Sequence, residues 1–543
     1  MTVTRRDVIR YGVLGAVAAA LPAQRLLLDR SAVSADPLAC AAHRVFTGDV
    51  SMPGGFTVPP GEIWLFDPAA TTTVTVTGNV VVEGTLRMRP AHAGVTHTIR
   101  FEGVNESAFV GGHTMVPLAS DVGLWVINQG ELDAQGTPRT GWDRAGDDPT
   151  WLATDELIRA PQTPWDSTTF AAHTKGAPAP AVTGPDGVLY PTEIANLTRN
   201  VRIEGTPTGR AHVMFVGCQR SQTLRHIAIR WMAPTKDTGT TYRSGGVQVP
   251  IDANVTGRYG LHFHHCGDGA RGTVVEGVVV RGTGGPAFVT HLSNGVTWQD
   301  CVAFDVRDAA YVWDSNTETH DVTYDRCAAL LVKTVPPFRG YNTTGFTLGE
   351  GSGMVARGCV AVGVQANRVN AGGFHWPATA NQDRNVWTFE DNVAHNNRGA
   401  GMSAWQNDAN PHLIERFTSY GNTMGVSHGA YINSYTYRDG VTFGNVSSEL
   451  DLHSLGSTLF ERVKFAGPVA ILKHSLPTGS VTRFVDCQIT GQVKVDEAGG
   501  DPGVFRFEST SPATDLTPDK FTVISRLSTI TVVNSDGSTF QVI

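Results

Sequence analysis

The feature that most constrains the fold is a repeat in the second half of the sequence. The segments GVTWQDCVAFDV, DVTYDRCAALLV and GMVARGCVAVGV share one pattern, in which Cys301, Cys327 and Cys359 occupy the same place. Repeats of roughly 25 to 33 residues made of strands and turns are typical of parallel β-solenoids, whereas a β-propeller blade needs about 40 to 45. Because stacked coils bury like residues in ladders, we expect the cysteines to be buried side chains and not redox or metal groups.

Composition agrees with an all-β protein, since the chain has 60 glycines and only 17% charged residues. The repeat is clear from about residue 201, and before it come short glycine-broken strands and a stretch rich in loops. A polar cap is expected where the solenoid ends. The expected regions are a β-rich domain at 36–142, a loop-rich connector at 143–200, a parallel β-helix at 201–500 and C-terminal strands or a cap at 501–543.

Residues 1–35 have the features of an export signal. Arg5 and Arg6 precede a short apolar run, and small residues end at Ala35, a predicted cleavage site. This segment resembles a twin-arginine signal, which implies a bacterial protein exported already folded to the periplasm, the cell envelope or the medium. An uncleaved anchor is the alternative, but the apolar run is shorter than the ~20 residues of a membrane span. We therefore expect no span in the mature chain.

Net charge argues against nucleic acid as a partner. The formal charge is −8 and becomes −11 once residues 1–35 are removed. An acidic chain without a basic patch is a poor binder of polyanions, so positive charge for an anionic substrate would have to be local. The seven cysteines have no zinc-ribbon or CxxC spacing.

The stretch GRYGLHFHHCGDGARG, residues 257–272, is the strongest candidate site. Alternate side chains on a strand point to opposite faces. The residues expected to enter the core are Tyr259, Leu261 and Phe263. The residues expected to form an outward row, with successive members about 6.5 to 7 Å apart, are Arg258, His262 and His264.

Residues distant in sequence can join this row because coils stack about 4.8 Å apart. A lone histidine is usually a surface group, and Asp300 and Asp308 are interpreted as turn residues. Several groups together favour general acid–base chemistry. The candidates that could join the row are His291 and the acids Asp305 and Asp314, with His212, Asp268, His375 and Trp376 as substrate-binding residues.

A divalent metal is a second explanation of the same row. His262 and His264 at i and i+2 could share a zinc ion with His291 as third ligand and water as the fourth. Asp-rich turns could instead hold calcium, although no EF-hand spacing is present. The sequence leaves the cofactor open between none, zinc and calcium.

Several segments resemble the group of CEMIP and transmembrane-protein-two, which are known as hyaluronan-degrading proteins. FTVPPGEIWLFDP and DVGLWVINQGELDAQG are similar to the eight-glycine domain, GRYGLHFHHCGD to the histidine motif, and AFVTHLSNGVTWQDCVAFDV to the following coil. The resemblance covers roughly residues 56–405. It implies an eight-glycine domain followed by a right-handed parallel β-helix, a solenoid of the pectate-lyase kind, that acts on hyaluronan or a similar polymer.

The resemblance also carries over individual residues. They are Arg258, Tyr259, His262 and His264 from the motif, and His291 from the coil after it. Gly260 stands where the family has proline, and Ala309 where it has histidine, which leaves Asp314 as the acid of that segment. These differences at positions of the family's motif imply that the catalytic set can differ from the family's. A bacterial member could also cut a different polysaccharide.

The function expected is therefore an exported, monomeric enzyme that degrades a uronate or amino-sugar polysaccharide. A hydrolase would use Asp305 and Asp314 as acid and base or nucleophile. A lyase would use Arg258 or a metal to neutralise a uronate carboxylate, while His262, His264 or Tyr259 moves the proton. The sequence leaves the two reactions open.

Two alternatives are not enzymes. A glycan-binding or structural β-helix protein of the cell envelope would hold sugars on aromatic rings. The tryptophans considered for that role are Trp142, Trp151, Trp165 and Trp376. A trimeric tail-like envelope protein is disfavoured by the export signal and the separate N-terminal β domain.

Overall fold

The fold is described from a computed structural model of the chain. The expected signal, residues 1–35, lies outside the described residues. The described residues are 42–542 without 164–165, 245–246, 314–318, 335–342, 350, 366–371, 377–385, 405–410, 430–433, 454–457, 473–480 and 498–501.

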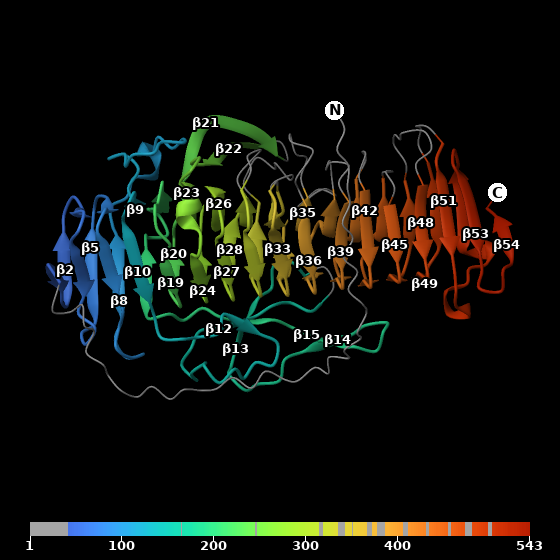
Figure 1. The fold of residues 1–543 in the computed structure, drawn as a ribbon, viewed down its shortest axis with the longest axis horizontal. Coiled ribbons are helices and arrows are strands. Elements are labelled where there is room, and N and C mark those ends of the chain that lie inside the picture. Colours follow the sequence, from blue (N-terminus) through green and yellow to red (C-terminus); the bar gives the residue numbers. More distant parts are fainter. Residues whose placement is uncertain are drawn as a thin grey trace, which may run out of the picture. The chain divides into compact units, whose positions relative to one another are not determined.

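Three long sheets of parallel strands dominate the described chain (Figure 1). Sheet A contains β1 (Arg44–Phe46), β4 (Ile63–Phe66), β7 (Thr85–Met88), β10 (Glu131–Gln135), β19 (Thr223–Arg225), β24 (Val274–Glu276), β27 (Thr297–Gln299), β30 (Thr323–Asp325), β33 (Met354–Arg357), β36 (Trp387–Glu390), β39 (Pro411–Glu415), β42 (Ser434–Arg438), β45 (Thr458–Glu461), β48 (Val481–Val485), β51 (Val504–Glu508), β53 (Thr529–Val533) and β54 (Thr539–Gln541). Sheet B contains β2 (Asp49–Met52), β5 (Thr72–Val76), β8 (His97–Phe101), β17 (Val201–Glu204), β20 (Ala228–Arg230), β25 (Val279–Arg281), β28 (Val302–Arg307), β31 (Ala328–Lys333), β34 (Val360–Val364), β37 (Val393–His395), β40 (Thr418–Tyr420), β43 (Val441–Phe443), β46 (Lys464–Ala466) and β49 (Gln488–Ile489). Sheet C contains β3 (Phe56–Val58), β6 (Val80–Val82), β9 (Leu124–Ile127), β18 (Val213–Val216), β23 (Leu261–Gly267), β26 (Phe288–Ser293), β29 (Ala309–Trp313), β32 (Thr344–Thr347), β35 (Gly372–Trp376), β38 (Ala400–Ala404), β41 (Met424–His428), β44 (Ser448–Leu452), β47 (Val469–Ile471), β50 (Val493–Asp496) and β52 (Phe521–Ser525).

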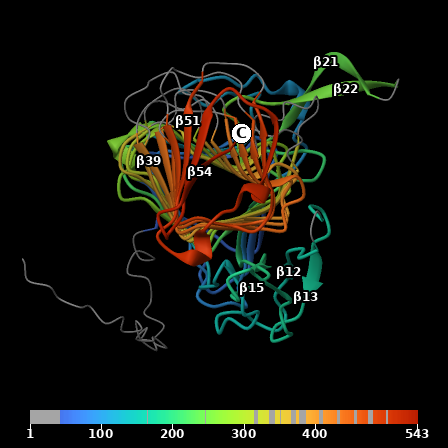
Figure 2. The ribbon, with the colours of Figure 1, turned by 90° about the vertical axis from the view of Figure 1, so that its right-hand side faces the viewer.

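The chain visits sheets A, B and C in turn, and we call one such passage a coil. In the coil that starts at β24, each strand pairs in parallel with the equivalent strand of the next coil. Side chains from all three sheets, such as Val275, Val280 and Phe288, belong to one buried cluster. Figure 2 shows the sheets from the side of β51 and β54. The expected all-β fold with long parallel sheets is confirmed.

The sheets continue through the expected region boundaries. Strand β7 pairs with β10, and β10 pairs with β19, although the chain between the last two makes a long excursion. The residues from 44 to 135 therefore share the sheets and the core of the residues after 201. Past residue 501, β51 pairs with β48 in the same way, and only β54 reverses direction, against β53.

The excursion between β10 and β17 forms a small antiparallel insertion. Its strands are β11 (Trp142–Asp143), β12 (Leu157–Arg159), β13 (Ala171–His173), β14 (Ala181–Thr183), β15 (Leu189–Pro191) and β16 (Ile194–Asn196). Apolar residues of the insertion, Trp142 and Leu197 among them, pack against outward side chains of sheet B such as Val302. The insertion thus covers one face of that sheet.

A second excursion separates β20 from β23. It is an antiparallel hairpin of β21 (Thr235–Ser244) and β22 (Val247–Asn254), and it leads directly into the histidine-rich strand. The described helices are short turns of 3-10 type: η2 (Glu106–Ala108), η3 (Asp268–Ala270), η4 (Pro512–Thr514) and η5 (Pro518–Lys520). No helix in the described residues is long and apolar enough to cross a bilayer.

Between sheets A and B many coils turn at a single residue in the left-handed conformation. Asp300 and Asp391 have φ of 52° and 58°, and Asp308 has φ of 69° at the next corner. Both turn predictions, for Asp300 and Asp308, are confirmed. The corners between sheets A and B stack into a column, and along this column side chains of opposite charge pair. For example, Arg416 Nε donates to Asp391 Oδ1 at 2.9 Å.

The cysteine ladder follows this column. Cys301, Cys327 and Cys359 are fully buried, each next to its left-handed residue. The Cys327 amide donates to Cys359 Sγ at 3.4 Å, one coil away. The cysteines in the described part of the chain form no disulfide. The prediction of a buried ladder is confirmed.

The corner between sheets B and C carries an asparagine ladder. Asn422 Nδ2 donates to Asn445 Oδ1 at 3.1 Å, and Asn397 Nδ2 donates to Asn422 Oδ1 at 2.9 Å. All three side chains are buried, so each coil satisfies the polar groups of the next.

Replacing Asn422 by alanine should lower the free energy of unfolding by about 2 to 3 kcal/mol. The reason is that the buried side-chain amides of Asn397 and Asn445 would each lose the hydrogen bond to Asn422. Denaturant unfolding of the variant measures this loss. The matched control is Gln488→Ala, an exposed position of β49, which should change stability by less than about 0.5 kcal/mol. Equal stability of the two variants would contradict the ladder.

A buried ion pair fixes the insertion to sheet B. Glu193, just before β16, accepts from His395 Nε2 at 2.7 Å and from Arg144 Nε at 2.9 Å. Burial alone would raise the pKa of Glu193, but the charges and hydrogen bonds of His395 and Arg144 outweigh it and lower the pKa to about 2.

The stability that Glu193 adds should therefore be present above pH 4.5, its ordinary pKa, and be lost as pH falls toward about 2. Glu193→Gln should be less stable than the wild type at pH 7, and the difference should shrink through that window. Denaturant midpoints measured against pH test this. A difference that stays constant down to the lowest pH would exclude a charged Glu193 as the cause.

Candidate functional site

The site is built where the loop between β8 and β9 meets the turn before β23. Arg258 in that turn is 0% exposed, and its Nε donates to Asp121 Oδ2 in the loop at 2.8 Å. The guanidinium carbon lies 4.8 Å from the ring centroid of Trp125. Asp121 also accepts from the Val110 and Gly111 amides at 2.7 and 2.9 Å. Arg258 is thus held inside the protein by Asp121, while its Nη2 has no hydrogen-bond partner.

Gly111 permits this close approach. It has φ of 73°, and a Cβ there would lie 2.8 Å from Val255 Cγ1 and 3.0 Å from the Thr256 carbonyl oxygen. Any other residue would push the loop away from the turn. The loop position, and with it the Asp121–Arg258 pair, therefore depends on glycine.

Strand β23 begins at Leu261, and from there the predicted alternation holds. Leu261 and Phe263 enter the core cluster, while His262 and His264 lie on the other face. Tyr259 was expected in the core, but it precedes the strand, and its ring centroid lies 4.9 Å from that of His262. The structure therefore places Tyr259 with the histidines, because strand alternation does not apply in the turn.

His262 is fully buried. Its Nδ1 donates to the Gly257 carbonyl at 3.0 Å, whereas its Nε2 has no hydrogen-bond partner. His212 lies deeper: its Nε2 is 3.1 Å from the Asp121 carbonyl oxygen and its ring is edge-on to Trp125, with centroids 4.7 Å apart. His212 therefore packs under the loop and not in the outward row.

His264 and His291 are direct neighbours on β23 and β26. They pair in register, and their rings stack with centroids 5.0 Å apart at an angle of 16°. His264 is 0% exposed; the His113 backbone is within hydrogen-bond reach of its ring, and at least one of its ring nitrogens has no partner. The register of the two strands therefore places His291 beside His264, as predicted.

Two histidines that sequence reasoning did not select complete the group. His265 is exposed, and its ring lies 4.3 Å from that of His264 and 5.0 Å from that of His291. His113, in the loop before β9, is also exposed and lies 6.2 Å from His264. We call these residues the histidine cluster: His113, His262, His264, His265 and His291.

A backbone irregularity brings His265 to the same side as His264. His265 has φ of 51°, and the pairing of β23 with β26 shifts register between His264 and Gly267. In a regular strand the two side chains would point to opposite faces. The HFHHCGD motif, with consecutive histidines before glycine, was the available signal. His113 and Asp121 gave none, because only the fold brings their loop to β23.

Burial keeps the imidazoles of His262 and His264 neutral. Burial, followed by the charges of His265 and His291, lowers the pKa of His264 to about 3. Burial, followed by the charge of His264, lowers the pKa of His262 well below its ordinary value. A neutral imidazole offers a lone pair to a proton, a hydrogen-bond donor or a metal ion. It carries no positive charge with which to neutralise an anionic substrate.

Two of the predicted acids, Asp268 and Asp305, have basic partners of their own. Asp268 lies in η3, exposed, where it accepts from Arg271 Nη2 at 2.9 Å. Asp305 lies on β28 of sheet B and pairs with Lys333, whereas the cluster lies on sheet C. Asp314 lies outside the described residues. The pair of Asp305 and Asp314 that the hydrolase hypothesis needs therefore stays a prediction.

The described aromatic residues that were expected to contact a sugar are buried. His375 and Trp376 lie on β35, where His375 Nδ1 is 3.2 Å from Ser403 Oγ and Trp376 packs in the core against Phe389. Trp142 and Trp151 are also buried, and Trp165 lies outside the described residues. The described tryptophans considered for sugar binding thus serve packing in this structure.

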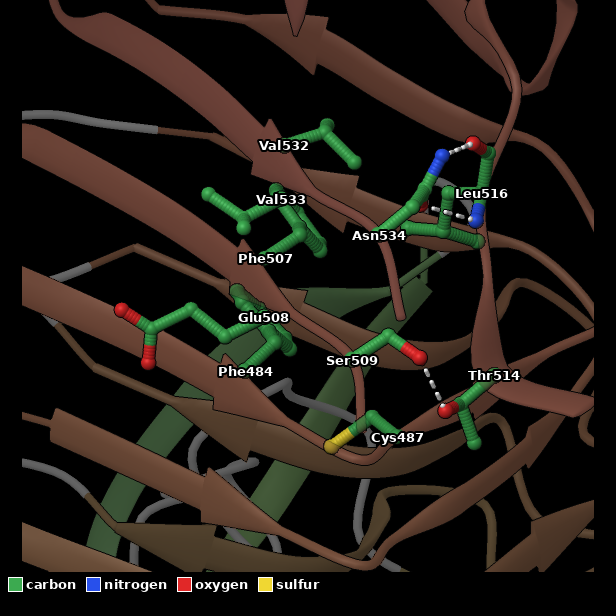
Figure 3. A pocket seen from close by; sticks show the side chains of 10 residues that line it. All are labelled: Phe484, Cys487, Phe507, Glu508, Ser509, Thr514, Leu516, Val532, Val533 and Asn534. Atoms are coloured by element: carbon green, nitrogen blue, oxygen red, sulfur yellow. Dashed lines mark hydrogen bonds between the residues drawn. The ribbon is translucent and has the colours of Figure 1, made fainter. Parts of the chain in front are cut away.

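A small cavity lies elsewhere, among β48, β51 and β53 (Figure 3). Apolar side chains line it together with Ser509 and Thr514, whose hydroxyls are 2.7 Å apart. Its one carboxylate, Glu508, pairs with Arg483. The cavity therefore lacks the histidine chemistry of the cluster.

Comparison with known protein families and with curated proteins finds no match.

Asp121→Asn should lower the free energy of unfolding by about 3 kcal/mol, because the charge of Arg258 would then be buried without its partner. Asp49→Asn, at an exposed position of β2, is the matched control and should change stability little. Denaturant unfolding compares the two variants. An Asp121→Asn variant as stable as the control would show that Arg258 does not need the carboxylate.

Proposed function

We propose that this protein is an exported enzyme that degrades a uronate-containing polysaccharide, hyaluronan or a similar amino-sugar polymer, at the histidine cluster. We further propose that its sheets form a right-handed parallel β-helix. The cyclic order of the sheets supports this fold, since crossovers between parallel strands are nearly always right-handed.

The observation that carries the function is a set of buried, neutral imidazoles beside exposed ones. His262 Nε2 and at least one ring nitrogen of His264 lack hydrogen-bond partners. Buried polar groups without partners are costly, and a bound water, ion or ligand that pairs with them removes the cost. His113 and His265 give the same cluster an exposed side where a polymer could bind.

Of the two reactions, elimination is better supported than hydrolysis. In elimination a base takes the proton beside the uronate carboxylate, the bond to the leaving glycosidic oxygen breaks, and that oxygen takes up a proton. A neutral imidazole of the cluster can be that base. Hydrolysis needs two carboxylic groups, and Asp305 lies on sheet B paired with Lys333.

The export proposal fits the cysteines. Twin-arginine export moves folded proteins, so such a chain folds in the reducing cytoplasm, where disulfides are rare. The described cysteines are buried and form no disulfide. The resemblance of the GRYGLHFHHCGD stretch to the hyaluronan-degrading group remains the basis for the proposed substrate class.

The test uses residues 36–543 with hyaluronan, chondroitin and other uronate polymers, and follows reducing ends together with ultraviolet absorbance of the unsaturated uronate. Elimination should give both signals, whereas hydrolysis gives reducing ends alone. His264→Gln should reduce the rate at least about 100-fold, because it removes the central imidazole. His92→Gln, an exposed histidine outside the cluster, should leave the rate unchanged.

Two results would overturn the proposal. If no polymer is cut but one binds, the protein is a glycan-binding protein of the cell envelope. If a polymer is cut equally well by His264→Gln with unchanged folding, the reaction takes place away from the cluster.

A further inference from the structure

We propose that His264, His265 and His291 bind one zinc ion, with water at the fourth position. One ring nitrogen from each of the three residues lies within 4.8 Å of those of the others. Two are consecutive in sequence, and the third is the register partner of His264 on the next strand. Three histidines and one open position form a known type of catalytic zinc site.

The state of His264 is the second observation. Its side chain is fully buried, the His113 backbone is within hydrogen-bond reach of its ring, and at least one ring nitrogen has no partner. Leaving a buried nitrogen unpaired is costly, and a bond to a metal ion removes that cost.

The backbone explains why these three residues can share an ion. The left-handed conformation of His265 turns its side chain to the face of His264. Nitrogens around tetrahedral zinc lie roughly 3.4 Å apart, for bonds of about 2.0 to 2.1 Å. Rotation of the His265 side chain can close the remaining distance, because this residue is exposed.

The set differs from the one that strand spacing indicated. His262 was expected as a ligand with His264 and His291, but its ring lies 6.3 Å from that of His291, and the three residues whose ring nitrogens lie within 4.8 Å of one another are His264, His265 and His291. His265 lies 5.0 Å from His291 and takes its place. Imidazole nitrogens favour zinc over calcium, which prefers oxygen ligands.

If the proposed function holds, on which this step rests, the ion has a defined task. Elimination requires a positive charge beside the uronate carboxylate. Arg258 was expected to supply it, but Arg258 is buried and paired with Asp121. A zinc ion at the exposed side of the cluster would neutralise the carboxylate, while another imidazole takes the proton.

The test measures the ion itself. Protein without an affinity tag is stripped with a chelator, dialysed and titrated with Zn²⁺ by calorimetry, and Co²⁺ is added to a parallel sample to record its visible spectrum. We expect one tight Zn²⁺ per chain, a tetrahedral Co²⁺ spectrum and no comparable binding of Ca²⁺. His265→Ala should weaken Zn²⁺ binding at least about 100-fold, and His291→Ala likewise.

His92→Ala is the matched control and should bind Zn²⁺ as the wild type does. His265 is exposed, so its variant should fold, and circular dichroism checks this. Absence of stoichiometric Zn²⁺ binding by folded wild type, or unchanged binding by folded His265→Ala, would overturn the zinc site. Tight Zn²⁺ binding without cleavage of any polymer would instead reject the proposed function and leave the site standing.

Discussion

The structure depends on the backbone hydrogen bonds that join each coil to the next. They fix the strands in parallel register, so every side chain lies directly above its equivalent one coil away. Inside, this stacks Phe288, Tyr311, Phe346 and Phe374 with ring centroids 4.6 to 4.8 Å apart. At the corners the same spacing requires polar groups that can pair with their own kind, or charges of opposite sign. The asparagine ladder and the Asp391–Arg416 pair are the two solutions seen here.

The histidine cluster is a departure from that regularity. Stacking alone brings His264 to His291, as it does any pair of equivalent residues. What distinguishes the site is a register shift at the end of β23, and a loop that Asp121 and Arg258 hold over it. A region with unpaired buried nitrogens is energetically costly, and the rigid coils on both sides supply the stability that supports it.

The repeat made much of the fold predictable. Apolar alternation and the recurring cysteines indicated parallel strands and the ladder, and both depend on local sequence. The shared sheets of residues 44–135 were not predicted as such, because those coils lack the cysteine pattern and their continuity is visible only in pairings such as β10 with β19.

The candidate site was predictable only in part, for similar reasons. Alternation placed His262 and His264 on one face, and stacking brought His291 beside them. Strand alternation also predicted the wrong face for Tyr259 and gave no reason to select His265. It fails at both positions, because the backbone turns at Tyr259 and is left-handed at His265. The burial of Arg258 could not be predicted, since its partner Asp121 lies 137 residues away in sequence.

The insertion between β10 and β17 has a consequence beyond covering sheet B. Its strands lie between two coils that nevertheless stack on each other as neighbours, with β10 against β19 and β8 against β17. The pairing of the coils therefore does not depend on the length of the chain that connects two sheets at a corner. Such a corner is a natural place for lineages to gain or exchange whole modules, and for an engineer to graft a foreign domain, without re-registering the coils on either side.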